Sequence, residues 1–116
     1  MKGVKIMTVS ELTEKTGFQL AAGESGSSNE ITGCYIGDLL SLAMARVEEG
    51  TAWVTIQTNI NIVAVAALQD AACIIIADGF SPDDNTAAKA NEEGIPILTT
   101  EKPAYDIAKA LSEFGI

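Results

Sequence analysis

Short apolar runs alternate with stretches of helical spacing along most of the chain. The strand-like runs begin near residues 31, 53, 73 and 95, and each is followed by a segment whose apolar positions recur at helical intervals. Alternating strands and helices predict a largely parallel sheet with right-handed crossovers. We therefore expect an α/β fold, a three-layer α/β/α sandwich of consecutive βα units. The length of 116 residues fits a single domain over residues 1–116.

The N-terminal part of the chain carries clear helix boundaries. Thr8 and Glu11 have the spacing of a capping box, so a helix is expected over residues 9–15, and Gly17 is expected to end it. The Gly- and Ser-rich segment 23–30 is expected to be a flexible polar loop unless a partner orders it. Short strands are expected at 5–7 and 18–20.

Two later helices are predicted to begin at capping side chains. Asp38 is expected to cap a helix over residues 39–49 that Gly50 ends. Thr100 is expected to cap the last helix, with Pro103 in its first turn. The remaining strands are expected at 31–37, 53–57, 73–78 and 95–99, and the remaining helices at 62–70 and 81–93.

The segment 62–68, IVAVAAL, is apolar almost all round. A helix with this pattern has to be covered on more than one side. Because a small domain has limited means to do so, we expect a second copy to contribute and the chain to form a homodimer. Trp53 begins the preceding strand and is expected to pack at the end of the sheet or at an interface.

Polar side chains gather where the predicted strands end. Thr58, Asn59 and Asn61 supply more amide and hydroxyl groups than one helix cap needs. The carboxyl ends of parallel strands meet at one edge of the sheet, where open α/β sheets bind small ligands. The candidate ligand-binding residues at this edge are Asp38, Thr58, Asn59, Asn61, Asp78, Thr99 and Thr100.

The net charge of −9 changes which ligands are expected, since the seven Lys and Arg residues are scattered along the chain. Nucleic acids and anionic membranes need clustered basic residues, so binding to either is disfavoured. No apolar run approaches the roughly 20 residues of a membrane span, and residues 1–7 lack the apolar core of a signal peptide. We expect a soluble, cytoplasmic protein. A nucleotide ligand stays compatible with this charge, because backbone N–H groups at helix N-termini can hold phosphate.

The residues needed for common catalytic sites are missing. The chain has no histidine, no P-loop and no GxGxxG motif, which excludes Ser-His and Cys-His nucleophiles. Cys34 and Cys73 lie in apolar runs and are expected to be reduced, buried thiols, and they cannot form a zinc site alone. Asp38 and Asp78 fit either a carboxylate pair that binds magnesium or, as the spacing favours, a helix cap and a turn former. We expect no enzymatic activity, no metal and no cofactor.

Three stretches, GCYIGDLLSLAM, AWVTIQTNINIVAVAALQDAACIIIADG and AKANEEGIPILTT, resemble the DRTGG domain family. Residues 29–34 read NEITGC, so Thr32 and Gly33 are what this chain keeps of the Asp-Arg-Thr-Gly-Gly string. The resemblance implies an α/β domain similar to the N-terminal domain of HPr kinase, without the catalytic part. It also implies an accessory, dimer-forming or ligand-sensing module. The motif residues that match are Thr32, Gly33, Thr58, Asn59 and Asn61.

Two functional hypotheses from different classes remain open. The first is a non-catalytic regulatory or ligand-sensing module that self-associates and binds a nucleotide-like small molecule. The alternative is a protein-binding adaptor for a separate metabolic enzyme, with the acidic surface and segment 23–30 as its contacts.

Overall fold

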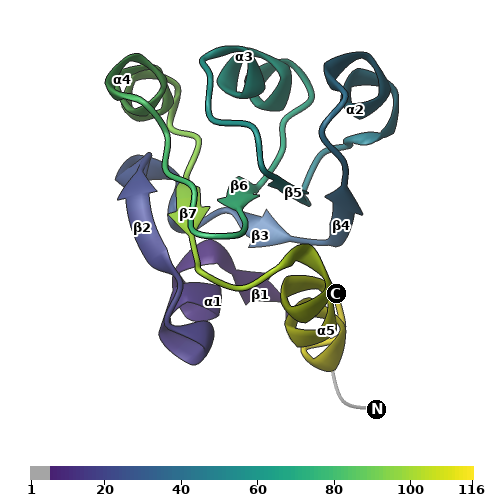
Figure 1. Ribbon diagram of the computed structural model, residues 1–116. Coiled ribbons are helices and arrows are strands. Elements are labelled where there is room, and N and C mark those ends of the chain that lie inside the picture. The colour runs from purple at the N-terminus through teal and green to yellow at the C-terminus, as the bar shows by residue number, and fades with distance from the viewer. Residues whose placement is uncertain (1–5) are drawn as a thin grey trace.

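The α/β/α sandwich expected from the sequence is confirmed by a computed structural model, which describes residues 6–116. Helices α2, α3 and α4 cover one face of a five-stranded sheet, and α1 and α5 cover the other (Figure 1). The elements are β1 (Met7–Thr8), α1 (Val9–Thr16), β2 (Gln19–Ala22), the 3₁₀ helix η1 (Glu24–Gly26), β3 (Glu30–Ile31), β4 (Gly33–Ile36), α2 (Leu40–Arg46), β5 (Thr51–Thr55), α3 (Asn61–Leu68), β6 (Cys73–Ile76), α4 (Asp84–Glu93), β7 (Ile97–Thr99) and α5 (Ala104–Glu113).

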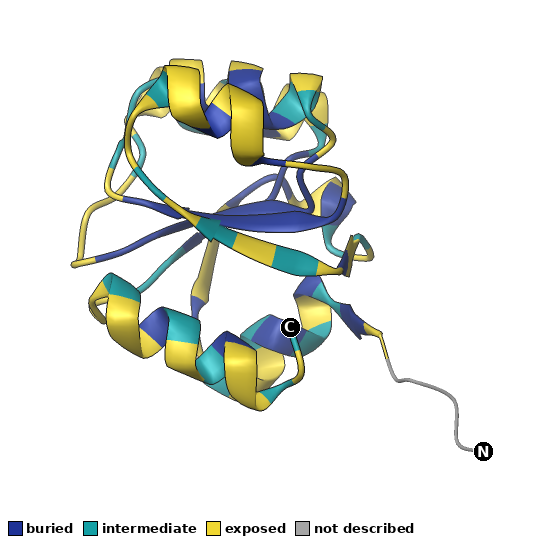
Figure 2. Ribbon diagram, turned by 90° about the vertical axis from the view of Figure 1, so that its right-hand side faces the viewer, coloured by how far each residue is buried: buried dark blue, intermediate teal, exposed yellow. Residues whose placement is uncertain are grey.

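The sheet has the strand order β2-β7-β6-β5-β4. Strands β4 to β7 are parallel, as predicted from the four βα units, and β2 pairs antiparallel with β7 at one edge. Every residue of β5 and β6 is buried, because both faces of these strands are covered by helices (Figure 2). This burial explains why the two strands are continuous apolar runs in the sequence.

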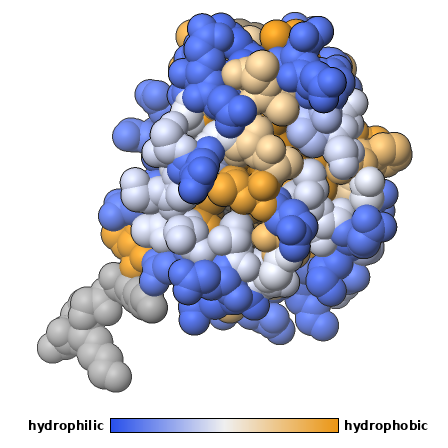
Figure 3. Space-filling view, turned by 90° about the vertical axis from the view of Figure 1, so that its left-hand side faces the viewer, coloured by the Kyte–Doolittle hydropathy of each residue, from blue (hydrophilic) through white to orange (hydrophobic). Residues whose placement is uncertain are grey.

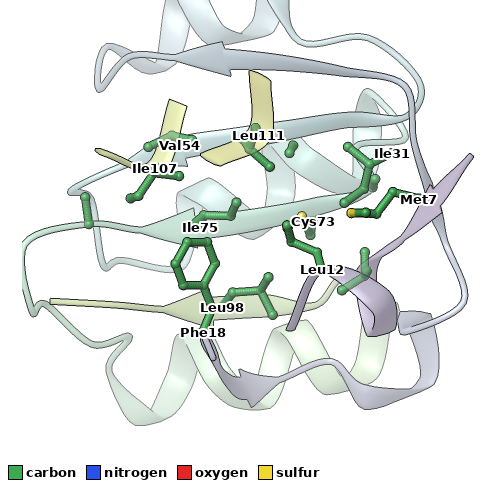
Figure 4. Packing of buried hydrophobic residues seen from close by; sticks show 14 residues of the cluster. Met7, Leu12, Phe18, Ile31, Val54, Cys73, Ile75, Leu98, Ile107 and Leu111 are labelled. Carbon is green, nitrogen blue, oxygen red and sulfur yellow. The ribbon is translucent and has the colours of Figure 1, made fainter. Parts of the chain in front are cut away.

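The sheet separates two hydrophobic clusters. On the α1 and α5 side, Phe18 packs beside Ile75 and Leu98, and Ile107 and Leu111 cover the neighbouring strands (Figure 4). The cluster on the other side is formed by residues of the sheet and of α2, α3 and α4, and its largest fully buried member is Trp53. Burying apolar surface on both sides of one sheet is the main stabilising contribution available to a domain of this size.

Trp53 lies in the middle of β5 rather than at its start, because β5 begins two residues earlier than expected. Its side chain is completely buried, and the indole N–H donates a hydrogen bond to the carbonyl oxygen of Gly37 at 2.9 Å. The interpretation that left Trp53 at an end of the sheet or an interface is therefore wrong. This residue ties β5 to the end of β4.

Local signals placed α1 correctly. The Thr8 hydroxyl oxygen accepts from the Glu11 amide at 3.2 Å, and the Glu11 carboxylate accepts from the Thr8 amide at 3.0 Å. Gly17 ends the helix with φ 77°, a left-handed conformation that glycine adopts without cost. The strand expected at 18–20 exists as β2. Of the short strand expected at 5–7, Met7 lies in β1 and Lys5 is outside the described residues.

Segment 23–30 is ordered, contrary to the expectation of a flexible loop. It contains η1 and the start of β3, and its Gly23 amide donates to the side-chain oxygen of Asn91 at 2.7 Å. The Asn29 side chain donates to the carbonyl of Ala72 at 3.1 Å. Gly23 packs its backbone directly on the peptide between Ile95 and Pro96. The glycines here serve close backbone approach rather than flexibility.

Two predicted caps are wrong. Helix α2 begins with Leu39 at its N-cap position and no side-chain cap, because the Asp38 carboxylate is bonded elsewhere, and the helix ends at Arg46 rather than at residue 49. At α5 the N-cap residue is Pro103, and the Thr100 hydroxyl instead accepts from the Lys102 amide at 3.2 Å. The end of β5 uses the Asp38 carboxylate, and the backbone of its own loop uses the Thr100 hydroxyl.

The cap of α4 is a carboxylate, in line with the predicted helix start. Asp83 accepts from the amide of Thr86 at 2.8 Å and from its hydroxyl at 2.7 Å. These hydrogen bonds, the side-chain one foremost, lower the pKa of Asp83 below its ordinary value, because they stabilise the charged form.

The prediction for the cysteines is half correct. Cys73 is buried in β6, and burial, with a smaller contribution from Cys34, raises its pKa to about 12, so the thiol stays protonated. Cys34 is exposed on β4, where desolvation still raises its pKa. Ala52 of β5 pairs with Cys34 of β4 on one side and with Cys73 of β6 on the other. Both cysteines are free thiols.

Helix α3 is largely covered within one subunit. It packs between α2 and α4 on the sheet (Figure 1), and Ile62, Val63, Val65 and Ala66 are buried. The covering expected from a second subunit is thus mostly supplied by the same chain. None of the helices within residues 6–116 combines the length and the hydrophobicity needed to cross a membrane.

Candidate functional site

The candidate residues lie at opposite ends of the sheet. Asp38, Thr58, Asn59 and Asn61 follow the carboxyl ends of β4 and β5, and Asp78, Thr99 and Thr100 lie at or beyond the ends of β6 and β7. Thr32 and Gly33 stand where β4 begins, so they lie at the amino edge. The nine residues therefore do not form one site.

Asp38 links the end of β4 to the end of β5 through hydrogen bonds. Its carboxylate accepts from the Thr55 hydroxyl at 2.8 Å and from the Ile56 amide at 2.9 Å, and the Gln57 side chain donates to its carbonyl oxygen at 2.9 Å. The Thr55 side chain is buried, so its hydroxyl needs this partner. The arrangement holds the β4–α2 loop on the end of β5.

Replacing Asp38 by alanine is expected to lower the free energy of unfolding by about 1–2 kcal/mol, because Thr55 and Ile56 lose a charged acceptor. Asp38→Asn retains an acceptor oxygen and should cost less. Urea denaturation followed by circular dichroism measures both. Equal stability of the alanine variant and the wild type would show that these hydrogen bonds contribute nothing.

The amide side chains after β5 mostly form hydrogen bonds within their own turn. Asn59 donates to the Gln57 side-chain oxygen at 3.2 Å and accepts from the Asn61 amide at 2.9 Å, so it organises the start of α3 without being its N-cap residue, which is Ile60. Within residues 6–116, the side chains of Thr58 and Asn61 make no hydrogen bond. These two, rather than the whole motif, stay available to a ligand.

Asp38 and Asp78 do not form a carboxylate pair. They follow β4 and β6, two strands that are roughly 9–10 Å apart because β5 lies between them. Asp38 is also committed to Thr55 and Ile56. No group of three or more potential metal ligands occurs among the described residues. The magnesium alternative therefore has no geometric support.

Backbone hydrogen bonds join the loop after β6 to the loop after β7. The amide of Asp78 donates to the carbonyl of Lys102, and the amide of Gly79 donates to the carbonyl of Thr100, both at 2.9 Å. Asp78 and Gly79 have φ of 61° and 78°, so the chain turns sharply through two left-handed residues. The turn delivers Phe80 to the surface with half of its side chain exposed.

A cavity of about 430 Å³ opens beside these loops, and we call it the carboxyl-edge cavity. It is lined by residues 79–81 and 99–102 together with the α1–β2 turn, residues 16–19. Thr99 and Thr100 were predicted for this edge, whereas Phe80, Glu101, Lys102 and the α1–β2 turn were not. The turn was missed because no sequence pattern shows that β2 pairs with β7.

A second cavity of about 610 Å³, the amino-edge cavity, lies at the other end of the sheet and includes Thr32. The Thr32 amide donates to the carbonyl of Gly50 at 2.8 Å. Four carboxylates line this cavity and no Lys or Arg does; the acidic residues are Glu30, Glu49, Asp70 and Glu93. Its electrostatic character is therefore strongly acidic.

The family model described as the DRTGG domain matches residues 11–114, nearly the whole chain. The chain belongs to the DRTGG domain family. This membership confirms the resemblance drawn from the three sequence stretches. No curated protein matches the chain.

Among solved structures, this DRTGG domain is similar to the CBS and DRTGG domains of the regulatory region of Clostridium perfringens pyrophosphatase, complexed with its activator diadenosine tetraphosphate. The TM-score is 0.73 at 11% sequence identity, and the match covers 92% of this chain and 46% of the other. The chain thus spans about half the length of that regulatory region. At this identity the likeness establishes the shared fold.

Proposed function

We propose that this DRTGG domain is a non-catalytic regulatory module that senses a nucleotide-like small molecule and self-associates. The observation that carries the proposal is family membership over residues 11–114, with the fold shared with a regulatory region that binds a nucleotide activator. The absence of histidine from the sequence and the structural use of Asp38 argue against acid–base chemistry. Both cysteines are free thiols, as is usual in the reducing cytoplasm.

Isothermal titration with a panel of adenine and guanine nucleotides tests the sensing role. We expect saturable binding of at least one nucleotide and a ligand-dependent rise in melting temperature, because a ligand of the native state stabilises it. A panel that gives neither heat nor a thermal shift would remove the nucleotide from the proposal.

Support for self-association comes from the distribution of exposed apolar side chains. Eleven large hydrophobic residues are exposed in the described part of the chain, and seven of them lie between residues 36 and 68. They lie on or next to β4, α2, β5 and α3, and we call them the apolar surface. Its members are Ile36, Leu39, Leu42, Met44, Ile56, Ile60 and Leu68. On the side with β2 and α4, hydrophobic groups form a strip between hydrophilic areas (Figure 3).

Leu42→Glu is expected to convert a dimer to a monomer, because a carboxylate placed in an apolar interface loses its hydration. The matched control is Leu20→Glu, since Leu20 is 40% exposed on β2 and Leu42 is 42% exposed on α2. Size-exclusion chromatography with light scattering reads out the mass. A wild-type protein that stays monomeric at high concentration would contradict self-association, and a dimer that survives Leu42→Glu would place the interface elsewhere.

The adaptor hypothesis keeps one supporting observation, the acidic amino-edge cavity. Four carboxylates without a basic neighbour in the cavity lining offer a contact for a basic segment of a partner enzyme. Co-purification at low salt tests it. A partner that is recovered and then lost in Glu49→Gln with Asp70→Asn would favour the adaptor over the sensing role.

A further inference from the structure

We propose that the carboxyl-edge cavity is the ligand site of this domain and that it binds a purine nucleoside monophosphate. The base stacks on Phe80, the ribose hydroxyls donate to Glu101, and the phosphate lies at Lys102. This inference rests on the proposed sensing function and gives it a location and a ligand class.

Charge distinguishes the two cavities. A phosphate in the amino-edge cavity would face four carboxylates, Glu30, Glu49, Asp70 and Glu93, with no cation in the lining. The carboxyl-edge cavity has one carboxylate, Glu101, and one ammonium group, Lys102. The chain carries a net charge of −9, which repels anions. Binding of an anionic ligand is therefore most favourable where a nearby cation balances the carboxylate. Of the two cavities, the smaller one therefore has the more favourable charge for a phosphate.

Phe80 supplies a surface for a nucleobase. Its side chain is 50% exposed, and within residues 6–116 the other exposed aromatic residue, Tyr105, lies outside both cavities. The backbone before Phe80 is held by the hydrogen bonds of Asp78 and Gly79 to the β7–α5 loop. The ring thus projects from a fixed turn, which lowers the entropy lost when a base stacks on it.

Glu101 is positioned by a glycine. A Cβ atom at Gly79 would approach a carboxylate oxygen of Glu101 to 2.8 Å, so the carboxylate lies directly against the Gly79 backbone. A carboxylate at the carboxyl edge of a parallel sheet is a suitable acceptor for ribose hydroxyls. Gly17 also lines the cavity, and nothing lies within 4 Å of the position that a Cβ atom would take there.

Size and charge together select the monophosphate. The cavity of about 430 Å³ falls at the lower end of the usual range for small-molecule sites, roughly 300–1,000 Å³. A single Lys102 balances little of the charge of a triphosphate. Purines are favoured over pyrimidines because their larger ring system covers more of the Phe80 face.

Titration of AMP and GMP into the wild type and four variants tests this site. Phe80→Ala is expected to weaken binding roughly five- to 150-fold, the usual effect of removing an aromatic stacking partner. Lys102→Ala should also weaken binding and should reduce its dependence on salt. The matched controls are Tyr105→Ala, an exposed aromatic residue of α5, and Lys109→Ala, a lysine of the same helix. Both controls should bind as the wild type does.

Amide chemical shifts of ¹⁵N-labelled wild-type protein locate the ligand without any substitution. The proposal expects shifts concentrated at residues 16–19, 79–81 and 99–102. Unchanged affinity in both Phe80→Ala and Lys102→Ala, or shifts confined to the amino-edge cavity, would overturn this site and leave the sensing function standing. No binding of any nucleotide by the wild type would overturn both.

Discussion

Replacing Trp53 by alanine is expected to lower the free energy of unfolding by about 3–5 kcal/mol, the usual cost of removing a large buried aromatic side chain. Trp53 is fully buried in the central strand β5 and contributes to the cluster beneath α2 and α3. The change leaves a void in the core and an unpaired carbonyl at Gly37, which now accepts from the indole. A loss of this size is a large part of the total free energy of unfolding of a small domain.

Urea denaturation followed by circular dichroism measures this loss, since Trp53 is the chain's one tryptophan and its fluorescence disappears in the variant. Trp53→Phe separates the two contributions, because it keeps most of the ring volume and removes the hydrogen bond. The exposed Tyr105→Ala should change stability by no more than about 0.5 kcal/mol. If Trp53→Ala were as stable as Tyr105→Ala, the packing described for the central strand would be wrong.

Replacing Gly23 by alanine is expected to destabilise the domain by about 3 kcal/mol or more, from a left-handed backbone and a steric collision acting together. Gly23 has φ 78°, and a Cβ atom there would collide with the carbonyl group of Ile95 and the ring nitrogen of Pro96. Both obstacles are backbone or a proline ring, so neither can rotate away. Segment 23–30 must therefore move away from Ile95 and Pro96.

Gly17→Ala is a closely matched control. Gly17 has nearly the same φ, 77°, but nothing lies within 4 Å of the added Cβ atom. It should cost only the left-handed strain, about 1 kcal/mol. The difference between the two variants in thermal or urea unfolding measures the collision alone. Equal losses would mean that segment 23–30 is not packed against residues 95–96.

These glycines also show where prediction from sequence fails. Glycine and serine in segment 23–30 are typical of a flexible loop, and the same glycines permit close packing on a segment about 70 residues away. Composition cannot separate the two cases, because the difference lies in the tertiary contact. The capping box of Thr8 and Glu11 was predictable because both partners lie within one turn.

Asp38 and Thr100 illustrate the same limit at the candidate site. Each stands where a capping residue should, but the Asp38 carboxylate bonds to the end of β5 and the Thr100 hydroxyl to an amide of its own loop. The four parallel strands and their common carboxyl edge followed from the spacing of the βα units. The cavity at that edge did not, because one of its walls comes from the α1–β2 turn, which reaches it only through the pairing of β2 with β7.

The positions of Met7 and Ile116 have a consequence for how such domains are combined. Met7 in β1 belongs to the cluster beneath the sheet, and Ile116 packs against the same cluster. Entry to and exit from the fold therefore occur on one side of the sheet, beside α5 (Figure 1). A unit with this geometry can be inserted into a surface loop of a host protein with a short connection at each end, so that host and guest keep their separate cores. Ordering or loosening the guest would then change the distance between two points of the host, which is a direct mechanical route for a bound ligand to act on an attached protein.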